Sequence, residues 1–180
     1  LRHYYRGGLI GKLFDDGFLY LGISRTRAMQ EYELLKTMHT LDLPVPEPIA
    51  YCVKRHRGYY RCDILTARIT NSQDLVGLLT NAPLSDQQWV NIGKCIAQFH
   101  YHGIYHHDLN CHNILIDDAD KVWLIDFDRG DQRPIKQQWQ QANLSRLHRS
   151  FRKELTRLNT FHWQESDWQL LMEGYLSELT

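Results

Sequence analysis

Two short stretches decide how this sequence is read: His106-His107-Asp108-Leu109-Asn110-Cys111-His112-Asn113 and Asp126-Phe127-Asp128. Two runs rich in β-forming residues lie between them, at Ile114–Ile116 and Val122–Ile125, and the polar turn 117–120 joins these runs. A hairpin of this kind brings the chain back to where it began. We therefore expect the polar side chains that precede and follow the hairpin to converge at one end of it.

The residue types in these stretches suit phosphoryl transfer. The HxDLxxxN pattern of kinase catalytic loops is matched at His106, Asp108, Leu109 and Asn113. The reaction needs a carboxylate beside the acceptor hydroxyl and oxygen ligands for a metal that bridges the nucleotide phosphates. We expect Asp108 to accept the proton of the acceptor, and Asn113 and Asp126 to hold Mg²⁺.

Two neighbouring residues, His106 and Asp128, have roles that their residue types alone do not fix. We expect His106 to fix the backbone of the loop rather than to transfer protons. Asp128 stands where protein kinases usually have glycine, and it adds a negative charge. It is either a third metal ligand, which we expect, or a partner for Arg129.

Two other kinds of site are suggested by residue types but not by their spacing. A zinc site is suggested by crowded ligand types at His100, His102, His106, His107, Cys111 and His112. No CxxC, HExxH or finger spacing accompanies them, and we expect His100 and His102 to lie on a helix surface or between lobes. A phosphate loop is suggested by Arg6-Gly7-Gly8 and Gly11-Lys12, but the GxxxxGK[ST] spacing is absent.

The order of elements predicts a sheet lobe at residues 1–70 and a helical lobe at residues 71–180. In the first, apolar spacing predicts a helix over Arg27–Leu41 with Ser24 or Thr26 as its N-cap. Two strands follow, at Ile49–Val53 and Tyr59–Ile69, with residues 55–58 as the turn of an antiparallel hairpin.

In the second part, the capping box Ser85-Asp86-Gln87-Gln88 starts a helix that Gly103 ends. A later helical pattern predicts an inner face made of Leu144, Leu147, Phe151, Leu155 and Leu158. The fold class is therefore α+β with two lobes.

Composition narrows the class of protein further. Of 180 residues, 43% are hydrophobic and 12% aromatic, which is enough for a packed core and excludes a disordered chain. No stretch reaches the roughly 18 uninterrupted apolar residues of a membrane span. Leu1 opens inside a strand-like run, so we expect the natural chain to begin earlier.

Beyond the two motifs, the chain closely resembles the lipopolysaccharide kinase family. The resemblance is carried by LRHYYRGGLIGK at residues 1–12, DLNCHNIL at 108–115 and VWLIDFDRG at 122–130. The likeness extends to NLSRLHRSFRK and FHWQESDW and covers nearly the whole chain. It implies a protein-kinase-like fold and ATP-dependent, Mg²⁺-dependent phosphorylation. The implied acceptor is a hydroxyl, at the 4-position, of 3-deoxy-D-manno-octulosonic acid (Kdo) on a lipid A precursor.

The resemblance also implies roles for individual residues. Asp108 matches the catalytic base, Asn113 and Asp126 match metal ligands, and Glu31 matches the helix glutamate that pairs with a strand cation. That cation is lysine in protein kinases, whereas here the similar position is Arg2, so Arg2 and Glu31 are the expected nucleotide-binding pair. The alternative for Glu31 is an ordinary exposed helix charge.

Three departures from protein kinases are visible. The Gly-rich loop that covers the phosphates would precede Leu1. Asn110 stands where protein kinases usually have lysine, and no Ala-Pro-Glu sequence follows Asp128. These features disfavour a protein substrate and favour a small or glycolipid acceptor.

The charge is uneven although the net charge is zero. Basic side chains gather after residue 128, and we give the name basic arm to Arg146, Arg149, Arg152, Lys153 and Arg157. The basic arm either solvates the helical lobe or anchors the chain peripherally to an anionic membrane, at the cytoplasmic face of the bacterial inner membrane. We expect no nucleic-acid partner, because no recognition motif accompanies the charge, and no obligate protein partner.

Alternative functions remain open from the sequence. Within the enzyme class these are a kinase of the core heptose of lipopolysaccharide and another small-molecule phosphotransferase. Outside that class, the chain is a degenerate kinase-like binding module, against which the intact set of Asp108, Asn113 and Asp126 argues.

Overall fold

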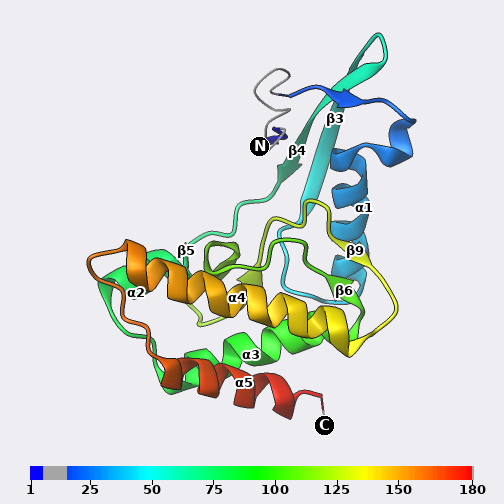
Figure 1. The fold of residues 1–180 in the computed structure, drawn as a ribbon. Helices are drawn as coiled ribbons and strands as arrows, with labels where there is room; N and C mark the ends of the chain where they lie inside the picture. Colours follow the sequence, from blue (N-terminus) through cyan, green and yellow to red (C-terminus); the bar gives the residue numbers. More distant parts are fainter. Residues whose placement is uncertain (6–15, 180) are drawn as a thin grey trace.

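Figure 1 shows the computed structural model, which describes residues 1–5 and 16–179. The two glycine-containing stretches that suggested a phosphate loop, Arg6-Gly7-Gly8 and Gly11-Lys12, lie outside the described residues. A β-sheet with one helix comes first along the chain and a mainly helical part follows. The expected two-lobed α+β class is confirmed, while the division at residue 70 stays a prediction.

The first lobe is an antiparallel sheet built on β4 (Tyr59–Thr66). Strand β3 (Pro48–His56) pairs with β4 with one register shift between Pro48 and Ala50. Strands β1 (Arg2–His3) and β2 (Phe18–Leu19) pair with β4 as well. The predicted hairpin is confirmed, but its turn is shorter than expected. Because His56 pairs with Tyr59, only Arg57 and Gly58 form the turn, and Arg57 adopts a positive φ of 46°.

The helix that the apolar spacing predicted is confirmed as α1 (Arg27–Thr40), and it packs against this sheet. It follows the 3-10 helix η2 (Ile23–Arg25) and begins after Thr26, which confirms that residue as the N-cap position. The Thr26 hydroxyl donates to the Ile23 carbonyl, 2.7 Å away, rather than capping the helix. Glu31 lies on the buried face of α1 with only 4% of its surface exposed, so the alternative of an exposed helix charge is wrong.

The second lobe begins with small antiparallel sheets that carry the polar stretches. Strand β7 (Ile114–Asp117) lies between β5 (Ser72–Asp74) and β8 (Val122–Leu124), so the predicted hairpin is confirmed. Strand β6 (Ile104–Tyr105), just before the catalytic loop, pairs with β9 (Asp131–Gln132). The 3-10 helix η3 (Cys111–Asn113) completes the loop.

Four helices support these sheets: α2 (Leu75–Asn81), α3 (Asp86–Tyr101), α4 (Gln137–Arg157) and α5 (Glu165–Ser177). The capping box at Ser85 is confirmed by both of its hydrogen bonds with Gln88. Gly103 ends the α3 region with a φ of 71°, a conformation that glycine adopts without steric cost. None of the described helices combines the length and apolar character needed to cross a membrane.

The inner face of α4 differs in part from the prediction. Leu144, Leu147 and Phe151 are buried as expected, but Leu155 is exposed. Glu154 is buried in its place, because this face of α4 packs against the catalytic loop and the Glu154 carboxylate reaches His112 and Arg157. The helix therefore presents polar groups to the loop as well as apolar groups to the core.

Candidate active site

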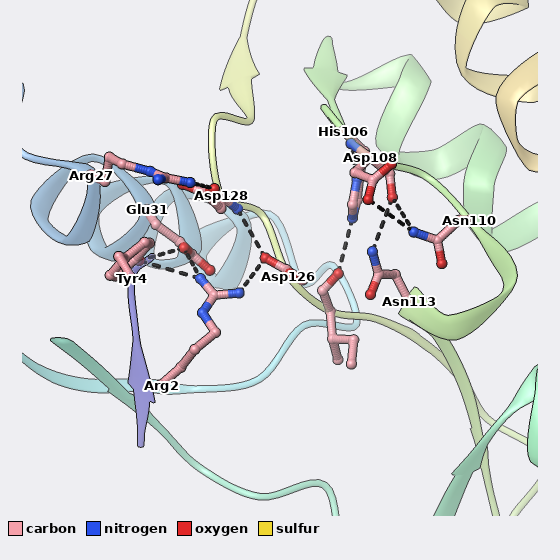
Figure 2. Close-up of polar contacts among 11 residues, drawn as sticks. Arg2, Tyr4, Arg27, Glu31, His106, Asp108, Asn110, Asn113, Asp126 and Asp128 are labelled. Carbon is pink, nitrogen blue, oxygen red and sulfur yellow. Dashed lines mark hydrogen bonds and ion pairs between the residues drawn. The ribbon is translucent and has the colours of Figure 1, made fainter. Parts of the chain in front are cut away.

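His106 holds the catalytic loop against the segment that carries Asp126. Its Nε2 lies 2.9 Å from the carbonyl of Ile125, and its Nδ1 accepts a hydrogen bond of 3.1 Å from the backbone N–H of Asp108 (Figure 2). Burial lowers the pKa of His106, so the ring is neutral with Nε2 protonated. This arrangement supports the expected role in fixing the backbone.

Helix α4 clamps the same loop through two polar side chains. The Asn143 amide accepts from the backbone N–H of His106 at 3.3 Å and donates to its carbonyl at 2.9 Å. The Ser150 hydroxyl accepts from the backbone N–H of Cys111 at 3.0 Å. Since Asn143 is only 1% exposed, these bonds satisfy backbone groups that water cannot reach.

The side chain of Asp108 points into solvent-accessible space. Its carboxylate accepts from Asn110 Nδ2 at 3.2 Å and lies 3.4 Å from the guanidinium of Arg146. With 60% of its side chain exposed, Asp108 can be reached by an acceptor hydroxyl. The carboxylate is thus oriented by neighbours without being enclosed.

Asn113 precedes the first strand of the hairpin and Asp126 follows the second, so both lie at the same end of it, as predicted. Asn113 Nδ2 donates to the carbonyl of Asp108 at 3.0 Å, and the backbone N–H of Ile125, next to Asp126, donates to the carbonyl of Asn113 at 3.0 Å. In the described part of the chain nothing donates to Asn113 Oδ1. An amide oxygen without a partner and a nearby carboxylate form a donor set that fits Mg²⁺.

Asp126 adopts a positive φ of 63°, which is unusual for a residue other than glycine. Such strain persists only where surrounding contacts enforce it. Here the contacts are the His106 bond to Ile125 on one side and Arg2, which forms an ion pair with Asp126, on the other (Figure 2). The backbone conformation therefore belongs to the way the site aims this carboxylate.

Arg2 bridges the two lobes. Its guanidinium forms ion pairs with both Glu31 on α1 and Asp126 (Figure 2). Burial by itself lowers the pKa of Arg2, but Glu31 and then Asp126 outweigh it and raise the pKa overall. The pair that the resemblance implied is thus brought together, with arginine in the place of lysine.

Tyr4 is a member of this cluster that the sequence did not reveal. It is buried, and its hydroxyl donates to Glu31 at 2.5 Å and accepts from Arg2 at 3.3 Å. Burial, followed by the negative charge of Glu31, raises the pKa of Tyr4, so the phenol stays protonated. Its position two residues after Arg2 was the available indication, because side chains two apart in extended chain point the same way.

Asp128 is held by Arg27, which no motif in the sequence indicates. Its two carboxylate oxygens accept from Nε and Nη2 of Arg27, which begins α1, and the Nε contact is 2.7 Å (Figure 2). The expected alternative partner, Arg129, is therefore replaced by Arg27. Because both carboxylate oxygens of Asp128 bind Arg27, the geometry favours a contact between the Asp-Phe-Asp segment and α1 rather than the expected metal ligand.

A cavity of about 310 Å³ lies between the lobes beside these groups. Arg2, Glu31, Asn113 and Asp126 line its polar side. Its apolar side is lined by Leu35, Pro46, Ile64, Ala67, Ile69, Leu115 and Ile125. One end can therefore take phosphates and the other a flat apolar group.

The histidines and the cysteine that suggested a zinc site have different partners in the structure and do not share one site. His100 packs against Tyr175 of α5, His106 holds the loop, and His112 lies between Asp74 and Glu154. Cys111 is buried, as expected for a small apolar residue. Among residues 1–5 and 16–179, no three His, Cys, Asp or Glu side chains are grouped so as to hold a metal ion.

Comparison with known proteins agrees with this geometry. The model of the Lipopolysaccharide kinase (Kdo/WaaP) family matches residues 1–175. Proteins named 3-deoxy-D-manno-octulosonic acid kinase are similar: that of Pasteurella multocida is 44% identical over 97% of this chain and 74% of its own length. Those of Vibrio parahaemolyticus and Mannheimia succiniciproducens are each 46% identical over 97% of this chain, and over 72% and 74% of their own lengths. With a kinase-type loop, a cation–glutamate pair and a match over nearly all of its length, the chain belongs to the Lipopolysaccharide kinase (Kdo/WaaP) family.

Proposed function

We propose that this kinase transfers the γ-phosphoryl group of ATP to a hydroxyl, the 4-hydroxyl, of a Kdo residue on a lipid A precursor. The names and the 44–46% identity of the relatives support the acceptor. The observation that carries the proposal is that Asn113, which is bonded to the Asp108 backbone, lines one cavity together with Asp126 and the Arg2–Glu31 pair (Figure 2). The reaction calls for neither a nucleic acid nor an obligate protein partner.

The chemistry follows from the charges of these groups. Asp108 accepts the proton of the acceptor hydroxyl while the hydroxyl oxygen attacks the γ-phosphorus and ADP leaves. Asn110 donates a hydrogen bond that orients the Asp108 carboxylate. Arg2 offers its guanidinium to the nucleotide phosphates, while Glu31 holds that guanidinium in place. Asn113 and Asp126 would hold Mg²⁺, which neutralises charge on the phosphates when it is bound.

The apolar part of the cavity suits the base of the nucleotide. The chain between β4 and β5 passes along it at Ala67 and Ile69, and the N–H of Ala67 is used by the carbonyl of Glu47 at 2.8 Å. A base bound in this part of the cavity is held mainly by apolar contact with Ile64, Leu115 and Ile125. Contacts of this type discriminate weakly between purines.

Mass spectrometry of the acceptor tests the proposal directly. The full-length protein, incubated with ATP, Mg²⁺ and a Kdo-bearing lipid A precursor, is expected to add one phosphoryl group to the Kdo residue. Asp108→Asn keeps the shape of the side chain but cannot accept the proton, so turnover should fall by orders of magnitude with the thermal midpoint unchanged. A heptose-bearing core acceptor serves as the competing substrate, and exclusive phosphorylation of heptose contradicts the proposal.

We also propose that the kinase works at the cytoplasmic face of the inner membrane, held peripherally by part of the basic arm. Three members of the basic arm have partners within the chain: Arg146 with Asp108, Arg152 with Glu165 and Arg157 with Glu154. Arg149 and Lys153 are exposed, and in the described part of the chain neither has a charged partner. These two positions therefore carry the proposal.

Vesicle sedimentation tests the membrane proposal separately from activity. Binding to vesicles that contain anionic lipid should weaken as salt is raised, and Arg149→Ala with Lys153→Ala should weaken it by about 1 kcal/mol per residue. Arg152→Ala, which removes a charge already paired with Glu165, is the control. Vesicle affinity that changes neither with salt nor with the double substitution contradicts peripheral anchoring by this surface.

A further inference from the structure

The catalytic loop itself supplies no fixed cation beside Asp108. Protein kinases usually have lysine where this chain has Asn110, and residues 108–113 contain neither lysine nor arginine. His112 is turned away, since its two ring nitrogens lie 3.3 Å from Asp74 and 3.4 Å from Glu154. The positive charge next to the base comes instead from Arg146 on α4, 3.4 Å from Asp108 Oδ1.

Arg146 has hydrogen-bonding capacity that its present contact does not use. Only Nη1 contacts Asp108, the side chain is 45% exposed, and no other partner is found among residues 1–5 and 16–179. Arg27 and Arg157 differ, because each directs two of its nitrogens at one carboxylate. The free edge of the Arg146 guanidinium can bind an anion through two parallel hydrogen bonds.

The local electrostatics also favour an anion at this place. The pKa of His107, adjacent to the base, is lowered first by burial and then by the charges of Arg129 and Arg146. Arg149 lies less than one turn further along the exposed side of α4. Positive charge therefore gathers beside Asp108, and the Arg146 guanidinium lies 3.4 Å from its carboxylate.

The positive charge of Arg146 can offset the repulsion that an acidic sugar would meet at this site. The carboxylate of such a sugar must approach a site that already contains the carboxylates of Asp108 and Asp126, and like charges repel. We propose that Arg146 binds the carboxylate of the acceptor sugar and so places the reacting hydroxyl at Asp108. This inference rests on the proposed function and names the residue that selects an acidic acceptor.

Kinetics with two acceptors and three variants test it. The acceptors are the Kdo-bearing lipid A precursor and the same molecule with the Kdo carboxylate converted to its methyl ester. Arg146→Ala should lower kcat/KM for the acidic acceptor about 10- to 100-fold, the usual effect of losing a charge-assisted hydrogen bond, with KM for ATP unchanged. Arg146→Lys should restore part of the loss, because it keeps the charge without the two-pronged geometry.

The ester isolates the interaction between residue and substrate. The unmodified enzyme should lose a similar factor when the acid is replaced by the ester, and Arg146→Ala should then cause no further loss on the ester. Arg152→Ala is the matched control: it lies on the same helix, is paired with Glu165, and should behave as the unmodified enzyme with both acceptors. Thermal midpoints are measured for all variants.

Three results overturn the inference. The first is an unmodified enzyme that uses ester and acid equally well. The second is an Arg146→Ala variant that loses the same factor on both acceptors, which means that Arg146 acts on the transferred phosphoryl group. The third is full activity of Arg146→Ala on the acid. If the unmodified enzyme phosphorylates neither acceptor, the proposed function fails instead, so the two failures are distinguishable.

Discussion

At the scale of single residues, the cluster of Arg2, Glu31 and Tyr4 shows how burial makes charges depend on one another. Burial raises the pKa of Glu31 and the charge of Arg2 opposes that shift, so the buried carboxylate needs the guanidinium to stay ionised. A pair of this kind is costly to break from one side. Its value lies in fixing the cation that meets the phosphates.

We expect Arg2→Met to lower kcat/KM on the order of 100-fold, since a positioned cation at the phosphates is lost. The same change leaves Glu31 buried without a counter-charge, which should destabilise the fold by about 2 kcal/mol or more. Adding Glu31→Gln should restore part of the stability but none of the activity. Urea unfolding and steady-state kinetics measure both, and strictly additive losses of stability would refute the coupling.

Asn143 is the second residue whose single replacement should reach the active site. Asn143→Ala leaves the backbone N–H and carbonyl of His106 without partners, at a cost of about 1–3 kcal/mol for each buried group. Because the loop holding Asp108 is then less fixed, kcat should fall while KM for ATP changes little. Asn159→Ala, at an exposed position after α4, is the control and should alter neither quantity.

At the scale of elements, the packing of α3 against α5 depends on two glycines. A Cβ at Gly174 would lie 2.1 Å from the carbonyl oxygen of Val90, and one at Gly93 would lie 1.9 Å from that of Leu171. Both obstacles are backbone atoms, which cannot move aside without moving a helix. The two helices therefore approach more closely than helices with side chains at these positions could.

Gly174→Ala should therefore destabilise the fold by about 3 kcal/mol or more, as overpacking does when backbone must shift. The better helix propensity of alanine returns only about 1 kcal/mol, so the clash decides the sign. Gly58→Ala, in the turn between β3 and β4 where a Cβ meets nothing within 4 Å, should be nearly neutral. Calorimetric midpoints of the two variants would disprove this argument if they moved equally.

Elements with a local cause were predictable from the sequence. The capping box at Ser85 and the hairpin between Asn113 and Asp126 depend on residues close together in the chain, and both were confirmed. The contact of Arg27 with Asp128 joins residues 101 positions apart, and no local pattern indicates it. Arg146 was read as one of several surface charges for the same reason, since only the fold brings α4 to the loop.

At the scale of the whole molecule, His100 connects three helices of the second lobe. It lies on α3, its Nδ1 is 2.8 Å from the Tyr175 hydroxyl of α5, and Gln140 of α4 donates to its carbonyl at 3.4 Å. Burial lowers the pKa of His100 to about 4, with smaller opposing and supporting effects of Asn143 and His106. The lobe therefore folds around a neutral imidazole.

The sign of the pH dependence follows from that pKa. An unfolded chain binds a proton on this histidine below its ordinary pKa of about 6.5, whereas the folded chain does so only near 4. Between these values the unfolded state holds more protons, so stability falls as pH falls from about 6.5 to 4, by about 3 kcal/mol for this group. Burial lowers the pKa of His106 as well, which adds to the loss in the same direction.

Denaturant unfolding at a series of pH values measures this dependence. His100→Gln retains an amide that can meet the Tyr175 hydroxyl but cannot titrate, so it should flatten the decline between pH 6.5 and 4 while costing some stability at pH 8. His102→Gln, in a position next to Gly103 that is partly exposed, is the matched control and should keep the slope of the unmodified protein. If the two variants gave the same slope, the acid sensitivity of the lobe would have to arise from other groups, such as His106 or the carboxylates, rather than from His100.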